Sequence, residues 1–491
     1  MVIVFVLVAV LVMAVIVTAN WYVWRRLFRD TTRGPGLTRR AGAVLIAGGW
    51  ILAITALVAE RSGAPFWLQQ VLAWPGFLWL ALSIYLLLAV LAGEFVRPLL
   101  RRYLEHRARR TTTPTAPSGA GVTSAAAAAP QPGVGTTHAP GTVSAAVSEP
   151  DQVAGAPAAA PQANGSGATS AAAAAAPQPG VGTTHAPAPS AAPAVAPQPD
   201  QDAAPTADPA PQPLPAGPSR RLFVSRVVAG AAAAAAVGTV GYGTYGVLRG
   251  PKVKRVTVPL AKLPRAAHGY RIAVVSDVHL GPVLGRGFAQ KVVDTINATQ
   301  PDLIAVVGDL VDGSVKDLGP AAAPLAQLRA RHGSYFVTGN HEYFSGAGQW
   351  VEEVRRLGIT PLENARREMP YFDLAGVNDV AGEEEGQGPD FVKALGDRDT
   401  ARACVLLAHQ PVQIHDAVEH GVDLQLSGHT HGGQLWPGNL IAAGANPTLA
   451  GLERYGDTQL YVSRGAGAWG PPTRVGAPSD ITLIELASKQ A

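Results

Sequence analysis

Side chains that can bind metal ions follow five short apolar runs in residues 251–491. Each run is rich in Val, Ile and Leu, which predicts a buried β-strand, and the alternation with helical patterns predicts an α/β domain. Ligands collect at the carboxyl ends of strands in open α/β sheets, so we expect the side chains to converge. In chain order the candidates are Asp277, His279, Asp309, Asn340, His409, His429 and His431, with His341 left over.

This donor set consists of two carboxylates, one amide and four imidazoles. Seven ligands exceed the needs of one ion with open positions, whereas two sites that share Asp309 as a bridge would use all of them. Mixed oxygen and nitrogen donors without a thiolate favour Mn²⁺, Fe or Zn²⁺ over Ca²⁺, Mg²⁺ or Cu⁺. Two dications against two carboxylates leave a net positive site, which favours an anionic substrate and a metal-bound hydroxide.

The order Asp-x-His, Gly-Asp-x-x-Asp, Gly-Asn-His-Glu, His, Gly-His-x-His resembles that of the calcineurin-like metallophosphoesterase superfamily. Three further blocks resemble its membrane-associated, twin-arginine-exported bacterial phosphodiesterase branch: Ser-Gly-His-Thr-His-Gly-Gly-Gln at 427–434, Ala-His-Gln-Pro at 408–411 and Tyr-Val-Ser-Arg-Gly at 461–465. The resemblance covers residues 251–491. It implies a four-layer α/β/β/α sandwich with a dinuclear metal centre.

The resemblance also assigns roles to individual residues. One ion would take Asp277, His279, Asp309 and His431, and the other Asp309, Asn340, His409 and His429, with Mn²⁺ as the favoured metal. A hydroxide between the ions would attack phosphorus, and His341 would donate a hydrogen bond or proton to the leaving oxygen. Asp312 would orient the His341 imidazole.

Several other residues leave alternatives open. Arg464 either contacts phosphate or fixes a loop, and Trp436 either walls the pocket or packs in the core. The acidic run 383–385 is expected in a solvated loop. Cys404 is the single cysteine, which excludes an intramolecular disulfide and a cysteine-based zinc site, and its apolar neighbours predict a buried side chain.

Apolar runs at 2–23, 41–59 and 71–93 are long enough to cross a membrane, so we expect three spans within a membrane region at 1–110. Arginines cluster between the first two spans and again after the third, while the loop between the second and third holds only Arg61. The positive-inside rule therefore places the first terminus outside and residue 110 in the cytoplasm. Because these arginines flank apolar runs, the pI near 9.2 does not favour a nucleic-acid partner.

Residues 111–218 are rich in Ala, Pro, Gly, Ser and Thr, which predicts a disordered linker. The linker contains a near-exact duplication, ending at Pro140 and Pro187. A fourth apolar run, 227–247, lies in a predicted span at 219–250 and follows Ser219-Arg220-Arg221-Leu222-Phe223, which resembles a twin-arginine signal. This span would place the domain at 251–491 outside the cytoplasm, although the basic residues at 249–255 argue against that orientation.

Together these observations predict a membrane-anchored, dinuclear metal-dependent phosphoesterase on the extracytoplasmic side. The resemblance alone favours a phosphodiester over a monoester, and the anchor favours a lipid-linked phosphate. Only 67 residues separate His341 from His409, which leaves limited room for a lipid-binding insertion. Two alternatives remain: a catalytically silent scaffold of the same fold, and a membrane sensor whose output is the esterase.

Overall fold

The computed structural model describes residues 2–111 and 219–491. The predicted linker, with its duplication, lies almost entirely outside the described residues. Four long apolar helices in the described parts could cross a membrane by length and composition. They are α1 (Val2–Trp24), α2 (Leu37–Arg61), α3 (Phe66–Thr111) and α4 (Arg220–Leu248). All four predicted apolar spans are therefore helical, and the chain is anchored in the membrane.

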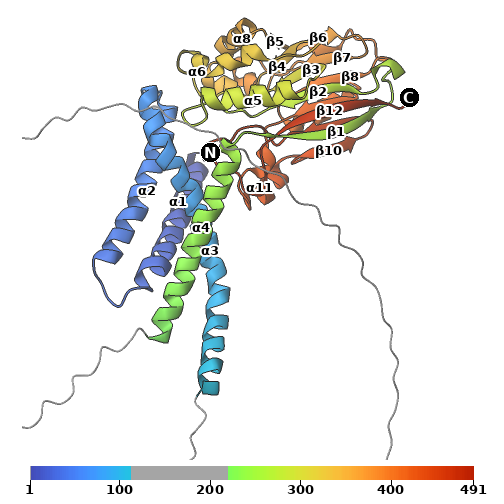
Figure 1. The fold of residues 1–491 in the computed structure, drawn as a ribbon. Coiled ribbons are helices and arrows are strands. Elements are labelled where there is room, and N and C mark those ends of the chain that lie inside the picture. The colour runs from blue at the N-terminus through green and yellow to red at the C-terminus, as the bar shows by residue number, and fades with distance from the viewer. Residues whose placement is uncertain (1, 112–218) are drawn as a thin grey trace, which may run out of the picture. The chain divides into compact units, whose positions relative to one another are not determined.

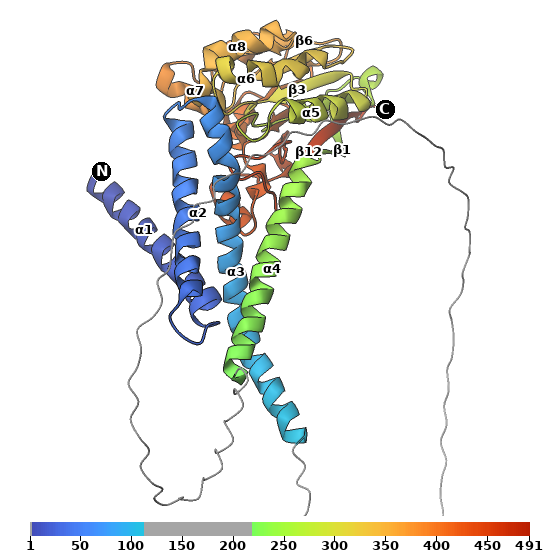
Figure 2. The ribbon, with the colours of Figure 1, turned by 60° about the vertical axis from the view of Figure 1, so that its left-hand side comes forward.

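Helix α3 packs between α2 and α4 (Figure 2). Small residues on α2 and α4 allow the close packing: Ala53, Ala56, Ala232 and Ala236 are all buried. A π-helical turn (Arg25–Arg29) continues α1, and Arg26 from this turn forms a 2.8 Å ion pair with Glu94 on α3. Most other large side chains of α1 and α2 are exposed, as expected for surfaces that contact lipid.

Residues 252–488 form two six-stranded sheets, shown in Figure 1. The first has the order β1 (Lys252–Leu260), β12 (Asp480–Ser488), β2 (Tyr270–Val275), β3 (Leu303–Val307), β4 (Ser334–Val337), β5 (Thr360–Pro361). The second has the order β10 (Gly451–Tyr455), β11 (Thr458–Val462), β9 (Leu424–Ser427), β8 (Cys404–Leu407), β7 (Asp373–Gly376), β6 (Ala365–Glu368).

The five predicted strands are β2, β3, β4, β8 and β9. Strands β2 to β4 run parallel in the first sheet, and β8 and β9 run parallel in the second. Both sets therefore deliver the residues that follow them to carboxyl edges. The sequence predicts that the candidate residues converge at the edge of one sheet. In the structure they come from the edges of two sheets.

Alternate residues of these strands point to different layers. Ile272 and Val274 from β2 and Ala305 from β3 belong to the core between the sheets, where they join Val405 and Leu407 from β8. The outer face of the first sheet packs on α5 (Arg286–Ala298), α6 (Val315–Ala322) and α8 (Ala347–Arg356). The outer face of the second packs on α9 (Phe391–Leu395) and α10 (Ile414–Glu419). The predicted four-layer α/β/β/α sandwich is confirmed.

Two short helices complete the domain. Helix α7 (Asn340–Ser345) begins directly at one of the predicted ligands, and α11 (Gly438–Ala445) follows the Gly-His-x-His block. Turns and short helical segments after β2, β3, β4, β8 and β9 therefore carry the candidate residues, and the strands fix where these residues lie.

Candidate metal centre

The backbone at the strand ends adopts an unusual conformation. Asp277, His279, Asp309, His429 and His431 all have positive φ angles, between 48° and 72°. This left-handed region is costly for residues with a side chain, and it is retained where the surrounding structure enforces it, often at functional sites. Five of the seven predicted ligands share this feature, so the turns are shaped to direct these side chains inward.

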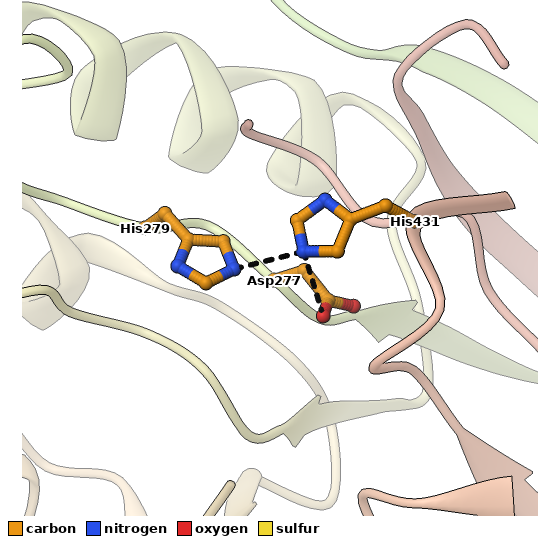
Figure 3. A group of neighbouring side chains, drawn as sticks. All are labelled: Asp277, His279 and His431. Carbon is orange, nitrogen blue, oxygen red and sulfur yellow. Dashed lines mark hydrogen bonds and ion pairs between the residues drawn. The ribbon is translucent and has the colours of Figure 1, made fainter. Parts of the chain in front are cut away.

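One cluster consists of Asp277, His279 and His431 (Figure 3). The Nε2 atoms of the two histidines lie 3.0 Å apart, and Nε2 of His431 lies 3.5 Å from Oδ1 of Asp277. The candidate ligand atoms of these three residues all lie within 4.8 Å of one another, close enough to bind a single ion.

A second cluster consists of Asp309, His409 and His429. Oδ2 of Asp309 lies 3.1 Å from Nε2 of His409 and 3.8 Å from Nε2 of His279. The same carboxylate oxygen thus faces an imidazole from each cluster. Asn340 completes the group, because its Oδ1 lies 3.0 Å from Nδ1 of His429.

Hydrogen bonds fix the protonation of two imidazoles. Nδ1 of His409 lies 2.9 Å from the carbonyl oxygen of Val307, which can only accept, so Nδ1 carries the proton. Nδ1 of His279 likewise lies 2.9 Å from Oδ1 of Asp312. In the neutral rings, both Nε2 atoms then present lone pairs, the form that binds metal ions. Nε2 of His409 is buried without a hydrogen bond, so the residues present fit a metal ion.

Close approach of backbone segments explains two glycines in the motifs. Gly308 has φ +70°, and a Cβ there would lie 2.5 Å from Nδ1 of His409 and 2.7 Å from the backbone of Gly339. A Cβ on Gly339 would in turn collide with the Asp309 carboxylate. The two strand ends therefore approach each other only because both positions lack a side chain.

Asp312 holds His341 beside this centre. A single oxygen, Oδ1 of Asp312, lies 2.9 Å from Nδ1 of His279 and 2.7 Å from Nδ1 of His341. The rings of His279 and His341 meet edge to face with centroids 4.7 Å apart. The third group of neighbouring titratable side chains thus consists of His279, Asp312 and His341.

Electrostatics reflect these contacts. Burial alone would raise the pKa of Asp312, but the two imidazoles lower it to about 2. Burial would lower the pKa of His341, but the Asp312 carboxylate raises it to about 9. Burial likewise opposes ionisation of Asp309 and His409, yet their mutual attraction lowers the pKa of Asp309 and raises that of His409. Burial lowers the pKa of His429 to about 4.

Two structural side chains were not predicted from the sequence. Glu342 is fully buried, and its carboxylate accepts hydrogen bonds from the backbone N–H groups of Asp309, Leu310 and Gly339, at 2.7 to 2.9 Å. Glu342 belongs to the Gly-Asn-His-Glu block, so its motif could have indicated a role. Its carboxylate ties the turn after β3 to the turn after β4.

Arg474 is the second. Its buried guanidinium donates to the carbonyl oxygens of Gly467, His431 and Ala477, and Nη2 lies 3.1 Å from Nδ1 of His431. This arginine lies in a loop 43 residues after His431, outside every motif, so no sequence signal identified it. It fixes the backbone and ring of one candidate ligand.

The remaining candidates lie apart from the centre or beside it. Trp436 is 51% exposed and its carbonyl accepts a 2.9 Å hydrogen bond from Tyr85 on α3, so its side chain does not pack in the core, and it is not among the residues that line the cavity beside His341. Trp469 takes the expected place, with its ring 5.8 Å from that of His341. Arg464 lies against Gly432, the residue after His431. Cys404 is buried, as predicted.

Comparison with known proteins agrees with this geometry. The family model of the calcineurin-like phosphoesterases matches residues 270–433. An uncharacterized metallophosphoesterase of Helicobacter pylori (strain J99) is 37% identical over 275 residues, which are 55% of this chain and 74% of that protein. The chain belongs to the calcineurin-like metallophosphoesterase family. The buried His and Asp clusters are the metal-binding clusters of this metallophosphoesterase domain.

Two other relatives extend the comparison. A transmembrane protein with metallophosphoesterase domain from Danio rerio is 40% identical over 264 residues, 51% of this chain and 60% of that protein. An uncharacterized metallophosphoesterase of Aquifex aeolicus is 34% identical, over 48% of this chain and 92% of that protein. The matched region of this metallophosphoesterase thus spans 60% of the Danio rerio relative.

Proposed function

We propose that this metallophosphoesterase is a membrane-anchored phosphodiesterase that uses two divalent ions, with Mn²⁺ favoured. One ion would be held by Asp277, His279, Asp309 and His431, and the other by Asp309, Asn340, His409 and His429. The observation that carries the proposal is the buried Oδ2 of Asp309, which faces Nε2 of His409 and of His279 at 3.1 and 3.8 Å. In their neutral rings both nitrogens would offer lone pairs to metal ions, and Asp309 would then be a ligand shared by the two groups of residues.

Bound ions would neutralise the phosphoryl oxygens and lower the pKa of the attacking water. The protein's own groups supply the rest. Nδ1 of His341 is protonated and donates a hydrogen bond to Asp312. The Nε2 atom of the same ring is then free to donate a proton to the leaving oxygen. Asp312 is a positioning residue, because it orients the rings of His279 and His341 with one oxygen. Glu342 and Arg474 hold the turns that carry the ligands.

The test uses the full-length chain in detergent with Mn²⁺, with bis(p-nitrophenyl) phosphate as the diester and p-nitrophenyl phosphate as the monoester. We expect metal-dependent hydrolysis that favours the diester, and two ions per chain by metal analysis. Asp309→Asn should abolish activity, whereas Asp294→Asn, an exposed carboxylate on α5, should not change it. Fewer than two ions, or full activity of Asp309→Asn, would contradict the proposal and favour a silent scaffold.

We also propose that the catalytic domain, from residue 251 onward, lies outside the cytoplasm. A cavity of about 450 Å³ lies beside the start of α4. Arginines from the first two helices and their connection, from α3 and from α4 itself line this cavity, among them Arg26, Arg39, Arg97 and Arg221. Helix α4 leads from these arginines to β1, and its 29 residues correspond to a length of roughly 44 Å. The positive-inside rule assigns the arginine end to the cytoplasm. The pair Arg220-Arg221 at the start of α4 is also the proposed twin-arginine signal.

Membrane-impermeant maleimide labelling of single cysteines in intact cells tests this orientation. The native Cys404 is buried, which keeps the background low. Glu384→Cys, on the exposed surface of the domain, should react in intact cells, and Arg102→Cys near the end of α3 only after permeabilisation. The opposite pattern would reverse the topology. Replacement of Arg220 and Arg221 by lysine should prevent labelling of Glu384→Cys if the twin-arginine pathway is used.

A further inference from the structure

The connection between α2 and α3 contacts the catalytic domain. Phe66, the first residue of α3, packs against the outer core of the first sheet, and Val283 of the domain packs against Ala56 and Phe77. Farther along α3, the Tyr85 hydroxyl donates to the carbonyl of Trp436. The end of α2 and the start of α3 are therefore held against the domain by packing and by a hydrogen bond.

A cavity of about 330 Å³ lies where this connection meets the candidate active site. The domain contributes Asp312, His341 and Phe344 to its wall. The membrane helices contribute two charged residues at the end of α2 and three large apolar side chains: Glu60, Arg61, Leu57, Phe77 and Leu80. The cavity therefore begins at the proton donor proposed above and ends on membrane helices.

Aromatic contacts link the two walls. The Phe344 ring meets the His341 ring edge to face with centroids 5.6 Å apart, and the Arg61 guanidinium lies 5.7 Å from the centroid of the same Phe344 ring. Phe344 is nevertheless 67% exposed, so its large apolar surface is not used in the core. Together with Leu57 and Leu80 it presents hydrocarbon next to the polar centre.

The apolar surface continues from the cavity along α2. Leu57 is followed toward the middle of the helix by Ile54 and Ile51, which are 50% and 64% exposed. Ile54 lies three residues before Leu57 and Ile51 three residues before Ile54, so each side chain neighbours the next along the helix surface. A hydrocarbon chain that left the cavity beside Leu57 would therefore meet the lipid-facing surface of α2 and not water.

We propose that the α2–α3 connection completes the substrate site, and that the substrate is a lipid phosphoester that enters from the membrane. This inference rests on the phosphoesterase function proposed above. A volume near 330 Å³ is at the low end of small-molecule sites, about 300–1,000 Å³, so it accommodates the ester group and the first methylenes of one arm. The rest of the chain remains in the bilayer. The segment between His341 and His409 is short and leaves limited room for a lipid-binding insertion. The membrane helices thus supply the apolar wall of the site instead.

The experiment uses full-length protein in lipid nanodiscs with Mn²⁺ and a series of p-nitrophenyl alkyl phosphates with methyl, butyl and octadecyl arms. Each buried methylene is worth about a fourfold gain in kcat/KM. We expect the butyl ester to exceed the methyl ester by at least about tenfold, and the octadecyl ester to be hydrolysed from within the bilayer.

Two variants of α2 test the wall. Leu57 and Leu52 are 40% and 38% exposed, and only Leu57 lines the cavity. Leu57→Asn should reduce the preference for the butyl ester over the methyl ester to less than about threefold. Leu52→Asn should behave as the unmodified protein.

The outcomes separate the two proposals. Hydrolysis of the methyl ester without any chain-length preference, or an equal preference in Leu57→Asn, would overturn the lipid proposal and leave the phosphoesterase function intact. Hydrolysis of the butyl ester but not of the octadecyl ester would show a soluble substrate and overturn entry from the membrane. No hydrolysis of any ester would overturn the phosphoesterase function, and the lipid proposal with it.

Discussion

Replacement of Asp312 by asparagine isolates the contribution of its charge. The amide keeps an oxygen at the Oδ1 position, where the Nδ1 atoms of His279 and His341 lie at 2.9 and 2.7 Å. A hydrogen bond to a charged acceptor contributes about 1.5–3 kcal/mol and one to a neutral acceptor about 0.5–1.5 kcal/mol. The loss is therefore about 1 kcal/mol for each bond and about 2 kcal/mol for the pair.

The titration of Asp312 gives a similar magnitude. Its pKa of about 2 lies nearly two units below the ordinary value of 3.8, because the imidazoles outweigh the opposing effect of burial. At about 1.4 kcal/mol per unit, the buried charge is stabilised by roughly 2–3 kcal/mol. If the two hydrogen bonds that orient the rings lose about 2 kcal/mol of free energy, and this loss appears in full in the transition state, kcat/KM decreases about thirtyfold.

The assay is metal-dependent diester hydrolysis by the full-length protein, with metal content measured on the same samples. We expect Asp312→Asn to retain two ions at saturating Mn²⁺, to bind them about tenfold more weakly because the His279 ring loses its charged hydrogen-bond partner, and to lose about thirtyfold in kcat/KM. Asp294→Asn serves as the control for a carboxylate outside the site. Activity within threefold of the unmodified protein would refute the reasoning, because the charge of Asp312 would then contribute nothing to either ring.

Three further predictions follow from the same structure. Gly308→Ala should lower the free energy of unfolding by about 3 kcal/mol, because its Cβ would combine left-handed backbone strain with contacts of 2.5 to 2.7 Å. Gly333→Ala is the control: Gly333 has φ +88° but no neighbour closer than 3.9 Å, so this variant should lose only about 1 kcal/mol. Equal losses of the two variants in denaturant titrations would contradict this account. Cys404 should resist alkylation at pH 8 in the folded chain, because burial raises its pKa to about 12, and it should react fully after unfolding; rapid labelling of the native protein, read by mass spectrometry, would exclude a buried thiol. Mn²⁺ at a thousand times its Kd should stabilise the chain by about 4 kcal/mol in thermal unfolding, an effect that a chelator reverses and that His409→Ala weakens; an unchanged midpoint on addition of metal would contradict binding to the folded state alone.

Sequence alone predicted the candidate donors and located the strands that carry them. Donor chemistry depends on residue type, and an apolar run followed by Asp or His is visible without coordinates. For that reason β2, β3, β4, β8 and β9 lie where the sequence predicted them, and the four apolar helices were found from length and hydropathy. Motif order also indicated the family, whose four-layer fold the structure confirms.

Tertiary structure decided which groups meet. The bond between Arg474 and His431 spans 43 residues, and the single Asp312 oxygen that holds two rings depends on where β2, β3 and β4 end. Neither follows from spacing, because separation along the chain does not fix distance in a folded core.

The approach of Arg61 and Leu57 to the His341 side of the site also depends on the fold alone. In the sequence these residues end an ordinary apolar span, far before His341 along the chain. Hydropathy marks them as a membrane anchor and carries no information about what the end of the helix contacts. Only the packing of α2 and α3 against the catalytic domain makes that anchor part of the proposed substrate site.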